Sequence, residues 1–261
     1  MIMKKILAIV IMTICSINAF SNNAEKNRDY YLIQVYHCST QAQVNHIDNY
    51  LKETYLPFLH SNGIVKVGVF APVDNDTAVD KRLFIWVPLK SLAQLDVLDQ
   101  KIEALDPYGD KPLIHLENAD GSLAYNRIER ILTKSFKDQP VFETKSDLTK
   151  SPDRIYEYRS YESETENLHL RKVHMFNEGD EIGLFKRLHF NAVFYSKVIA
   201  GSRMPNLIYM TSFNNMEDRN AHWKAFGDDA QWKKISTMDM YKKTVSKNDT
   251  VLMTARLYAD F

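Results

Sequence analysis

The sequence predicts an α+β protein built from two copies of one β-α-β-β-α-β unit. Strand-like segments recur about 125 residues apart, and apolar stripes with helical spacing lie between them. The paired strand segments are residues 30–36 with 155–161, 65–70 with 190–195, 83–87 with 208–212, and 127–132 with 252–257. We interpret this recurrence as a tandem duplication.

Helices are predicted between the strands. In the first copy, apolar residues recur at intervals of three and four over residues 44–59 and again over residues 92–105, which is typical of helices that cover a core. Pro57 interrupts the first stripe, and we expect it to kink the helix or to end its regular part. In the second copy we expect the first helix over residues 164–188, with a break near Gly179.

This order of elements predicts two tandem ferredoxin-like domains, each a four-stranded antiparallel sheet with helices on one face. The other face of each sheet also needs cover, and in a duplicated chain the sibling sheet can supply it. We therefore expect an intrachain, barrel-like sandwich with the helices outside. The expected boundaries are a first domain at 29–140, a polar linker at 141–152 and a second domain at 153–261.

The first residues are typical of a secretory signal peptide, which we place at 1–21. Lys4 and Lys5 precede an apolar run that is too short for a bilayer span of about 20 residues. We do not expect Cys15 to be lipidated, because Ile14 stands where a small residue is usual. The mature protein is therefore expected to be secreted or periplasmic, with no integral membrane span.

Charge and cysteine content narrow the range of partners. Two of the 33 basic residues lie in the signal segment, which leaves 31 against 33 acidic residues. A nucleic-acid partner would favour an excess of basic residues, so none is expected. Cys38 is the single cysteine after cleavage, so no intrachain disulfide is expected. Oligomeric state stays open between a monomer with pseudo-two-fold symmetry and a homodimer.

The second copy resembles the NIPSNAP family of the dimeric α/β-barrel superfamily, and residues 66–70 and 125–129 of the first copy resemble its secreted, duplicated members from Bacteroidetes-like bacteria. The resemblance rests on residues 155–161, 185–195, 204–210 and, most specifically, 219–232. Asp229-Ala-Gln-Trp stands where the family usually shows Asp-Pro-x-Trp. The resemblance implies a dimeric α/β-barrel fold, formed here within one chain. It implies little about a reaction, because a fold does not determine function.

None of the eight histidines stands in a recognised ligand motif, and no metal site is expected. His222 precedes Trp223 in the most family-specific segment, and related members of the superfamily bind haem through a helix histidine near that place. One axial histidine and an apolar pocket would hold haem. We favour the plainer interpretation, in which His222 lies on a polar helix face and Trp223 anchors the core.

Glu157, Arg159 and Tyr161 alternate along one predicted strand and therefore share a face. A functional interpretation makes Arg159 an anion anchor and Glu157 a base with a raised pKa. We favour a structural interpretation, in which the two charges form a half-buried pair that joins the two sheets.

A second cluster contains Asn191, Tyr195, Lys197 and Tyr209, with Trp223 and Phe226 placed to close it. Such residues either line a cavity for a small aromatic molecule or form core, and both interpretations stay open. The complete set of candidate ligand-binding residues is Glu157, Arg159, Tyr161, Asn191, Tyr195, Tyr209, His222, Trp223, Phe226 and Trp232.

The leading functional hypothesis is a secreted protein that binds a small apolar or aromatic ligand between the sheet and helices of the second domain, without a cofactor. The alternative is an oxidoreductase of the monooxygenase type, haem-dependent or cofactor-free. A third hypothesis is a structural or interaction module. The sequence does not decide whether the chain is an enzyme or whether the first domain has a site of its own. The absence of a Gly-x-Ser-x-Gly motif, a phosphate loop and a Rossmann fingerprint excludes the enzyme classes that use them.

Overall fold

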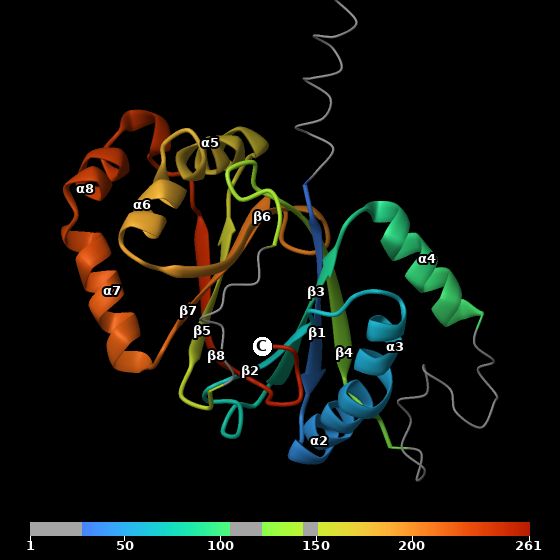
Figure 1. The fold of residues 1–261 in the computed structure, drawn as a ribbon. Coiled ribbons are helices and arrows are strands. Elements are labelled where there is room, and N and C mark those ends of the chain that lie inside the picture. Colours follow the sequence, from blue (N-terminus) through green and yellow to red (C-terminus); the bar gives the residue numbers. More distant parts are fainter. Residues whose placement is uncertain (1–27, 105–121, 143–150) are drawn as a thin grey trace, which may run out of the picture.

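In a computed structural model that describes residues 28–104, 122–142 and 151–261, eight antiparallel strands form one closed barrel. The strand order around the barrel is β1-β3-β2-β8-β5-β7-β6-β4. The helices lie outside the barrel in two groups, one beside each half of the chain (Figure 1). The predicted signal segment, residues 1–21, and positions 143–150 of the predicted linker lie outside the described residues.

The elements of the first half follow the predicted order. They are β1 (Tyr30–Cys38), α2 (Gln41–Tyr50), the π-helical turn η1 (Leu51–Tyr55), α3 (Leu56–Ser61), β2 (Gly68–Pro72), β3 (Lys81–Leu89), α4 (Leu92–Glu103) and β4 (Arg127–Ser135).

The second half repeats this order with more helices. Its elements are β5 (Ile155–Glu162), α5 (Glu166–Phe176), α6 (Glu181–Arg187), β6 (Asn191–Ala200), β7 (Asn206–Phe213), α7 (Met216–Asp228), α8 (Ala230–Ser236), the 3₁₀ turn η2 (Asp239–Tyr241) and β8 (Lys247–Ala255).

Each half has the strand order of the ferredoxin-like unit, β4-β1-β3-β2 in the first and β8-β5-β7-β6 in the second. The two sheets join at both edges, where Phe70 of β2 lies opposite Ala255 of β8 and Ser135 of β4 lies opposite Ser196 of β6. The predicted barrel-like arrangement within one chain is confirmed. Closure leaves no free edge in the sheet that the described residues form.

The fourth pair of strand segments, residues 127–132 with 252–257, was aligned wrongly. Tyr36 lies opposite Ile128 on β4, and the matching Tyr161 lies opposite Asn248 on β8. The equivalent positions are therefore 120 residues apart, whereas the sequence alignment paired Ile128 with Met253. A strand with a weak apolar pattern carries little register information of its own, so a similar pattern a few residues away can be matched by mistake.

Strand β2 is also shorter than the predicted segment 65–70, because it begins at Gly68. Val65, which lies in that predicted segment, is 61% exposed, although Val67 is fully buried. The residues before Gly68 therefore lead from α3 toward the sheet outside its hydrogen-bonded ladder.

Pro57 does not end the helix in which it lies. It is the second residue of α3, and the chain just before it forms the π-helical turn η1, in which the Leu56 N–H donates to the Leu51 carbonyl. A wider turn makes room for the proline ring in a continuing helix. The predicted break near Gly179 is confirmed between α5 and α6. A Cβ at Gly179 would lie 2.5 Å from the Met175 carbonyl oxygen, so a larger residue would not fit there.

The barrel interior is a continuous apolar core shared by both halves. Trp86 of β3 stacks on Phe194 of β6, with ring centroids 5.6 Å apart, and Phe84 packs on Tyr158 of β5. The C-terminal Phe261 is 2% exposed and contacts Trp86. No helix in the described ranges is long and apolar enough to cross a membrane.

Candidate functional site

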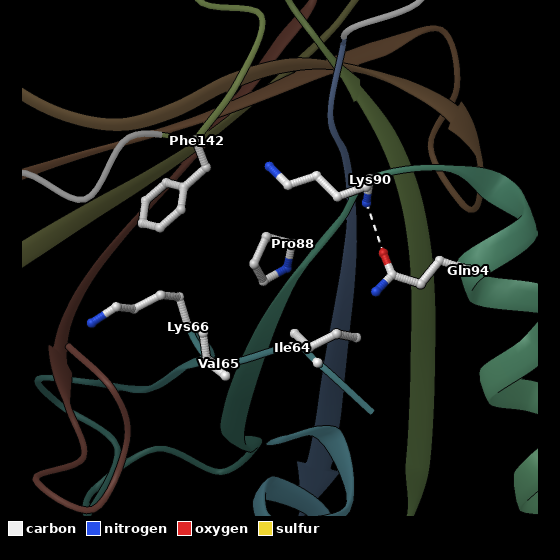
Figure 2. Close-up of a pocket in the computed structure, with 8 residues that line it drawn as sticks. Ile64, Val65, Lys66, Pro88, Lys90, Gln94 and Phe142 are labelled. Atoms are coloured by element: carbon white, nitrogen blue, oxygen red, sulfur yellow. Dashed lines mark hydrogen bonds between the residues drawn. The ribbon is translucent and has the colours of Figure 1, made fainter. Parts of the chain in front are cut away.

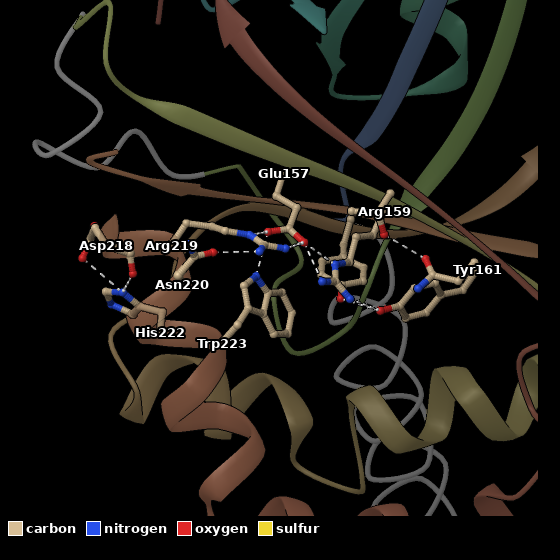
Figure 3. Close-up of polar contacts among 11 residues, drawn as sticks. Glu157, Arg159, Tyr161, Asp218, Arg219, Asn220, His222 and Trp223 are labelled. Atoms are coloured by element: carbon tan, nitrogen blue, oxygen red, sulfur yellow. Dashed lines mark hydrogen bonds and ion pairs between the residues drawn. The ribbon is translucent and has the colours of Figure 1, made fainter. Parts of the chain in front are cut away.

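Glu157 is the centre of a polar network between strand β5 and helix α7 (Figure 3). Its side chain is fully buried, and its carboxylate accepts hydrogen bonds from three residues. Arg159 Nε lies 2.7 Å away, Arg219 Nε and Nη2 lie 2.8 and 3.0 Å away, and Trp223 Nε1 lies 2.7 Å away. Two guanidinium groups and one indole therefore surround a single buried carboxylate.

This environment keeps Glu157 ionised. Burial raises its pKa, but the hydrogen bond from Arg219, the charge of Arg159 and the hydrogen bond from Trp223 together lower the pKa below its usual value. The expectation of a base with a raised pKa is therefore wrong. The geometry agrees with a structural ion pair, although it joins a strand to a helix and includes Arg219, which the sequence analysis did not select.

The network continues from Arg159 along the outer face of the sheet. Arg159 Nη1 donates to the Tyr161 hydroxyl over 2.9 Å, and that hydroxyl lies 2.9 Å from the Tyr209 hydroxyl on β7. The guanidinium carbon of Arg159 also lies 3.9 Å from the centre of the Trp223 ring, a close cation–π contact. Four of the predicted site residues are thus brought together with Glu157.

The predicted aromatic cluster forms a packed layer between the sheet and the helices. Ring centroids are 5.7 Å apart for Tyr195 and Tyr209, 5.4 Å for Trp223 and Phe226, and 4.5 Å for Phe226 and Trp232. These side chains contact one another, and that packing agrees with the core interpretation. The hydroxyl of Tyr195 is buried and has no hydrogen-bond partner among the described residues.

Sequence reasoning also missed a buried lysine that lies beside this layer. Lys172 of α5 is 5% exposed and lies 3.0 Å from Glu181 of α6. Its ammonium group lies 4.9 Å from the centre of the Phe176 ring. The sequence offers a weak signal for this pair, because lysine and glutamate on a helix are usually solvated and periodicity alone does not reveal a buried pair.

Asn191 and His222 lie at the edges of the cluster. Asn191 Nδ2 donates to Ser212 Oγ over 2.9 Å. His222 Nδ1 lies 2.8 Å from the Asp218 carbonyl oxygen and 3.2 Å from the Asp218 carboxylate, both acceptors, so Nδ1 carries a proton and Nε2 is the ring nitrogen that remains available. The His222 ring packs edge-on against Phe190, with centroids 5.3 Å apart, and its side chain is 22% exposed.

A pocket of about 310 Å³ lies between helix α5, strand β6 and the loop that leads to β7. Its lining residues are Glu166, His169, Leu170, Lys197, Val198, Ile199, Met204 and Pro205. None of the ten predicted site residues lines this pocket. Leu170 and Met204 are 58% and 50% exposed, so the pocket has an apolar, solvent-facing rim.

His169 is the buried polar residue of this pocket. It is 7% exposed, and its Nδ1 atom has no hydrogen-bond partner in the part of the chain that the structure describes. Burial, and then the positive charge of Lys197, lower the pKa of His169 below its usual value, so the imidazole is neutral near pH 7. Sequence reasoning missed His169 because a single histidine in a helical stripe has no distinctive spacing.

Comparisons with known proteins agree with this fold. Residues 156–258 match the NIPSNAP family model. No curated protein sequence matches the chain. Among solved structures, a monooxygenase-like protein from Lactobacillus acidophilus has a TM-score of 0.56 at 8% identity, and the match covers 87% of this chain and 94% of that protein.

Two further solved structures are similar over nearly the whole chain. A monooxygenase-like protein from Fusobacterium nucleatum has a TM-score of 0.51 at 7% identity, covering 88% of this chain and 93% of that one. An anthrone oxidase-like protein has a TM-score of 0.52 at 10% identity, covering 89% and 93%. At these identities the likeness shows a shared fold alone.

The Glu157 network predicts a strong, pH-dependent effect of Glu157→Gln on stability. The variant leaves two arginines facing each other without their carboxylate, so we expect the free energy of unfolding to fall by about 3 kcal/mol near pH 7. Because the native pKa of Glu157 is lowered, its contribution is complete above the unfolded value of 4.5 and is lost as the pH falls through the native pKa. Urea unfolding from pH 7 downward should therefore show a smaller loss of stability below pH 4.5 in the variant than in the wild type.

The exposed Glu164 provides the matched control. Glu164→Gln should change stability by less than about 0.5 kcal/mol and keep the wild-type pH dependence. Equal stabilities for the Glu157 and Glu164 variants would contradict the role given to the network.

Proposed function

Through residues 156–258 the chain belongs to the NIPSNAP family, and on that premise we propose that it is an exported protein that binds a small, neutral, apolar or aromatic molecule. The binding site in this proposal is the pocket between α5 and β6. The observation that carries the proposal is the pocket itself, which combines an exposed apolar rim with a few polar groups. Small-molecule sites commonly have this composition.

The charges of the pocket favour a neutral ligand. Lys197 and Glu166 have opposite signs and both line it, so the pocket has no net charge from these two side chains. Leu170, Val198 and Met204 supply the apolar surface that a ring or a branched chain would cover. A hydroxyl or carbonyl group on the ligand would find a donor in the Lys197 ammonium group.

His169 supports a ligand with one polar group. A buried polar atom without a partner is unfavourable by about 1–3 kcal/mol, and a neighbouring group that pairs with the imidazole would relieve this. A neutral imidazole has one donor and one acceptor, so it suits an uncharged partner better than an ion. The ligand class predicted from the sequence is retained in this proposal, whereas the set of residues is new.

A binding measurement with 1-naphthol tests the proposed pocket. Leu170→Glu replaces an apolar rim residue with a carboxylate, and we expect it to weaken 1-naphthol binding about tenfold in a calorimetric titration. Val79 is 93% exposed and does not line the pocket, so Val79→Glu is the matched control and should leave the affinity unchanged. Equal affinities in both variants, or no binding by the wild type, would sink the proposal.

Export is the second part of the proposal and rests on the signal-like sequence at 1–21. We expect the intact mass of the protein recovered from the periplasm or the medium of a bacterial host to lack this segment. Replacing Lys4 and Lys5 with Glu should reduce processing, because the positive region guides insertion. An unprocessed mass in the cytoplasm of the wild-type culture would overturn this part of the proposal alone.

An oxidoreductase is the second candidate function, and the hydrogen bond of His222 favours it. Donation from Nδ1 to the Asp218 carbonyl leaves Nε2 free to act as a metal ligand, an arrangement common in metal-binding histidines. His222 would hold a haem iron in this candidate, and bound haem would supply redox chemistry.

A hemin titration tests this second candidate. If His222 is an axial ligand, the wild type should give a saturable, shifted Soret band that His222→Ala removes. His46, which lies on α2 in the other half of the chain, provides the control, and His46→Ala should keep the band. A band that is absent, or that persists in His222→Ala, would rule out haem ligation by His222.

A further inference from the structure

A second pocket, of about 200 Å³, lies in the first half of the chain at the end of strand β3 (Figure 2). It is bounded by the segment between α3 and β2, by the start of α4 and by Phe142. Its lining residues are Gly63, Ile64, Val65, Lys66, Pro88, Lys90, Gln94 and Phe142.

The polar lining of this pocket is cationic. Lys66 and Lys90 both line it, and its described lining contains no acidic residue. Lys66 makes no ion pair or hydrogen bond with any other described side chain. Lys90 is paired with Asp29, whose oxygens both lie 3.0 Å from its Nζ atom. Among the described residues, one positive charge at the pocket therefore has no partner, in contrast to the balanced charges of the pocket beside α5.

The buried carboxylate of Asp29 positions the cationic side of the pocket. Asp29 is 2% exposed, and it also accepts a hydrogen bond from the Phe142 N–H over 2.8 Å. Gln94 Oε1 accepts the Lys90 N–H over 2.8 Å. Asp29 thus holds Lys90 and Phe142 on the same side of the pocket, and Figure 2 shows the Lys90 side chain reaching toward the Phe142 ring.

The rest of the pocket is apolar. Pro88 lies between Lys66 and Lys90 (Figure 2), and Val65 is 61% exposed at the surface. The Phe142 ring packs on Trp86, with centroids 4.7 Å apart. The indole Nε1–H of Trp86 is buried and has no acceptor among the described residues, so the wall behind Phe142 contains an unused donor. A volume of about 200 Å³ suits one aromatic ring with a substituent, because a dry cavity of about 150 Å³ holds benzene.

We infer that this pocket binds a small aromatic carboxylate, with the carboxylate beside Lys66 and Lys90 and the ring against Phe142 and Pro88. The first half of the chain then has a binding site of its own, independent of the proposed site beside α5. The unpaired ammonium of Lys66 selects an anion, and the apolar surface selects a ring over a hydrated inorganic ion.

Benzoate and benzamide test this inference, because they have nearly the same shape and differ in charge. We expect benzoate to shift the backbone amide resonances of Val65, Lys66, Lys90 and Gln94 and the indole resonance of Trp86 in a ¹⁵N NMR titration. Benzamide should bind about three- to fivefold more weakly, the range expected for partly exposed charge pairs. The benzoate affinity should also fall as salt is added, because salt screens exposed charges.

Lys66→Gln is the decisive variant, because Lys66 has no partner to lose in the part of the chain that the structure describes, whereas Lys90 supports the buried Asp29. It should lower the affinity for benzoate about three- to fivefold and leave that for benzamide unchanged. Lys234→Gln, on the exposed face of α8, is the matched control. It makes the same change in net charge at a position distant in the sequence, so it should leave the affinity for benzoate unchanged.

Three outcomes would overturn the inference. They are equal affinities for benzoate and benzamide, equal effects of the Lys66 and Lys234 variants, and shifts confined to residues outside the pocket. Leu170→Glu should leave benzoate binding intact, so a failure of the site beside α5 can be told from a failure of this one.

Discussion

The pairing of β2 with β8 and of β4 with β6 is the constraint on which the rest of the structure depends. Each half presents a sheet whose two faces are both apolar, and the helices of that half cover only the outer face. The inner faces meet in one core that draws Trp86 from the first half and Phe194 and Tyr158 from the second. Neither half could bury its inner face alone, so the two sheets stabilise one another.

The outer faces of the two halves are stabilised in different ways. In the first half, residues such as Val44, Ile47 and Leu51 pack on the sheet as an aliphatic core. In the second half, aromatic rings fill the same layer, and the buried charges of Glu157 and Lys172 lie among them. Buried charges need complete sets of partners, and each added partner fixes another element in place. The network around Glu157 therefore determines how α7 lies on the sheet and, through Tyr161 and Tyr209, ties β5 to β7.

Most of the fold could be predicted from the sequence, because strand and helix periods reflect which face of each element is buried. The order of elements, the break near Gly179 and the closed arrangement of two sheets follow from these periods. The correspondence between positions of β4 and positions of β8 could not be predicted, since a strand with a weak pattern can be displaced along its partner without changing its apparent type.

The candidate site was harder to predict. Glu157, Arg159 and Tyr161 were placed correctly on one face, but the partner Arg219 is 62 positions away from Glu157, and only the packed structure brings them together. The roles of such residues depend on long-range contacts that local spacing does not encode. For the same reason, sequence reasoning did not select His169 and grouped Lys197 with Asn191 and Tyr195, whereas His169 and Lys197 line a pocket formed by two elements that are not adjacent in the chain.

Closure of the barrel within one polypeptide also changes how the molecule responds to dilution and to mutation. Two separate subunits would dissociate as their concentration fell, whereas two halves on one chain meet at a high and constant effective concentration. In a symmetric pair of identical subunits, a substitution changes both subunits at once. In a single chain with two halves, it changes only one half. One half can therefore acquire a cationic pocket while the other acquires a neutral one, without either change being imposed on its counterpart.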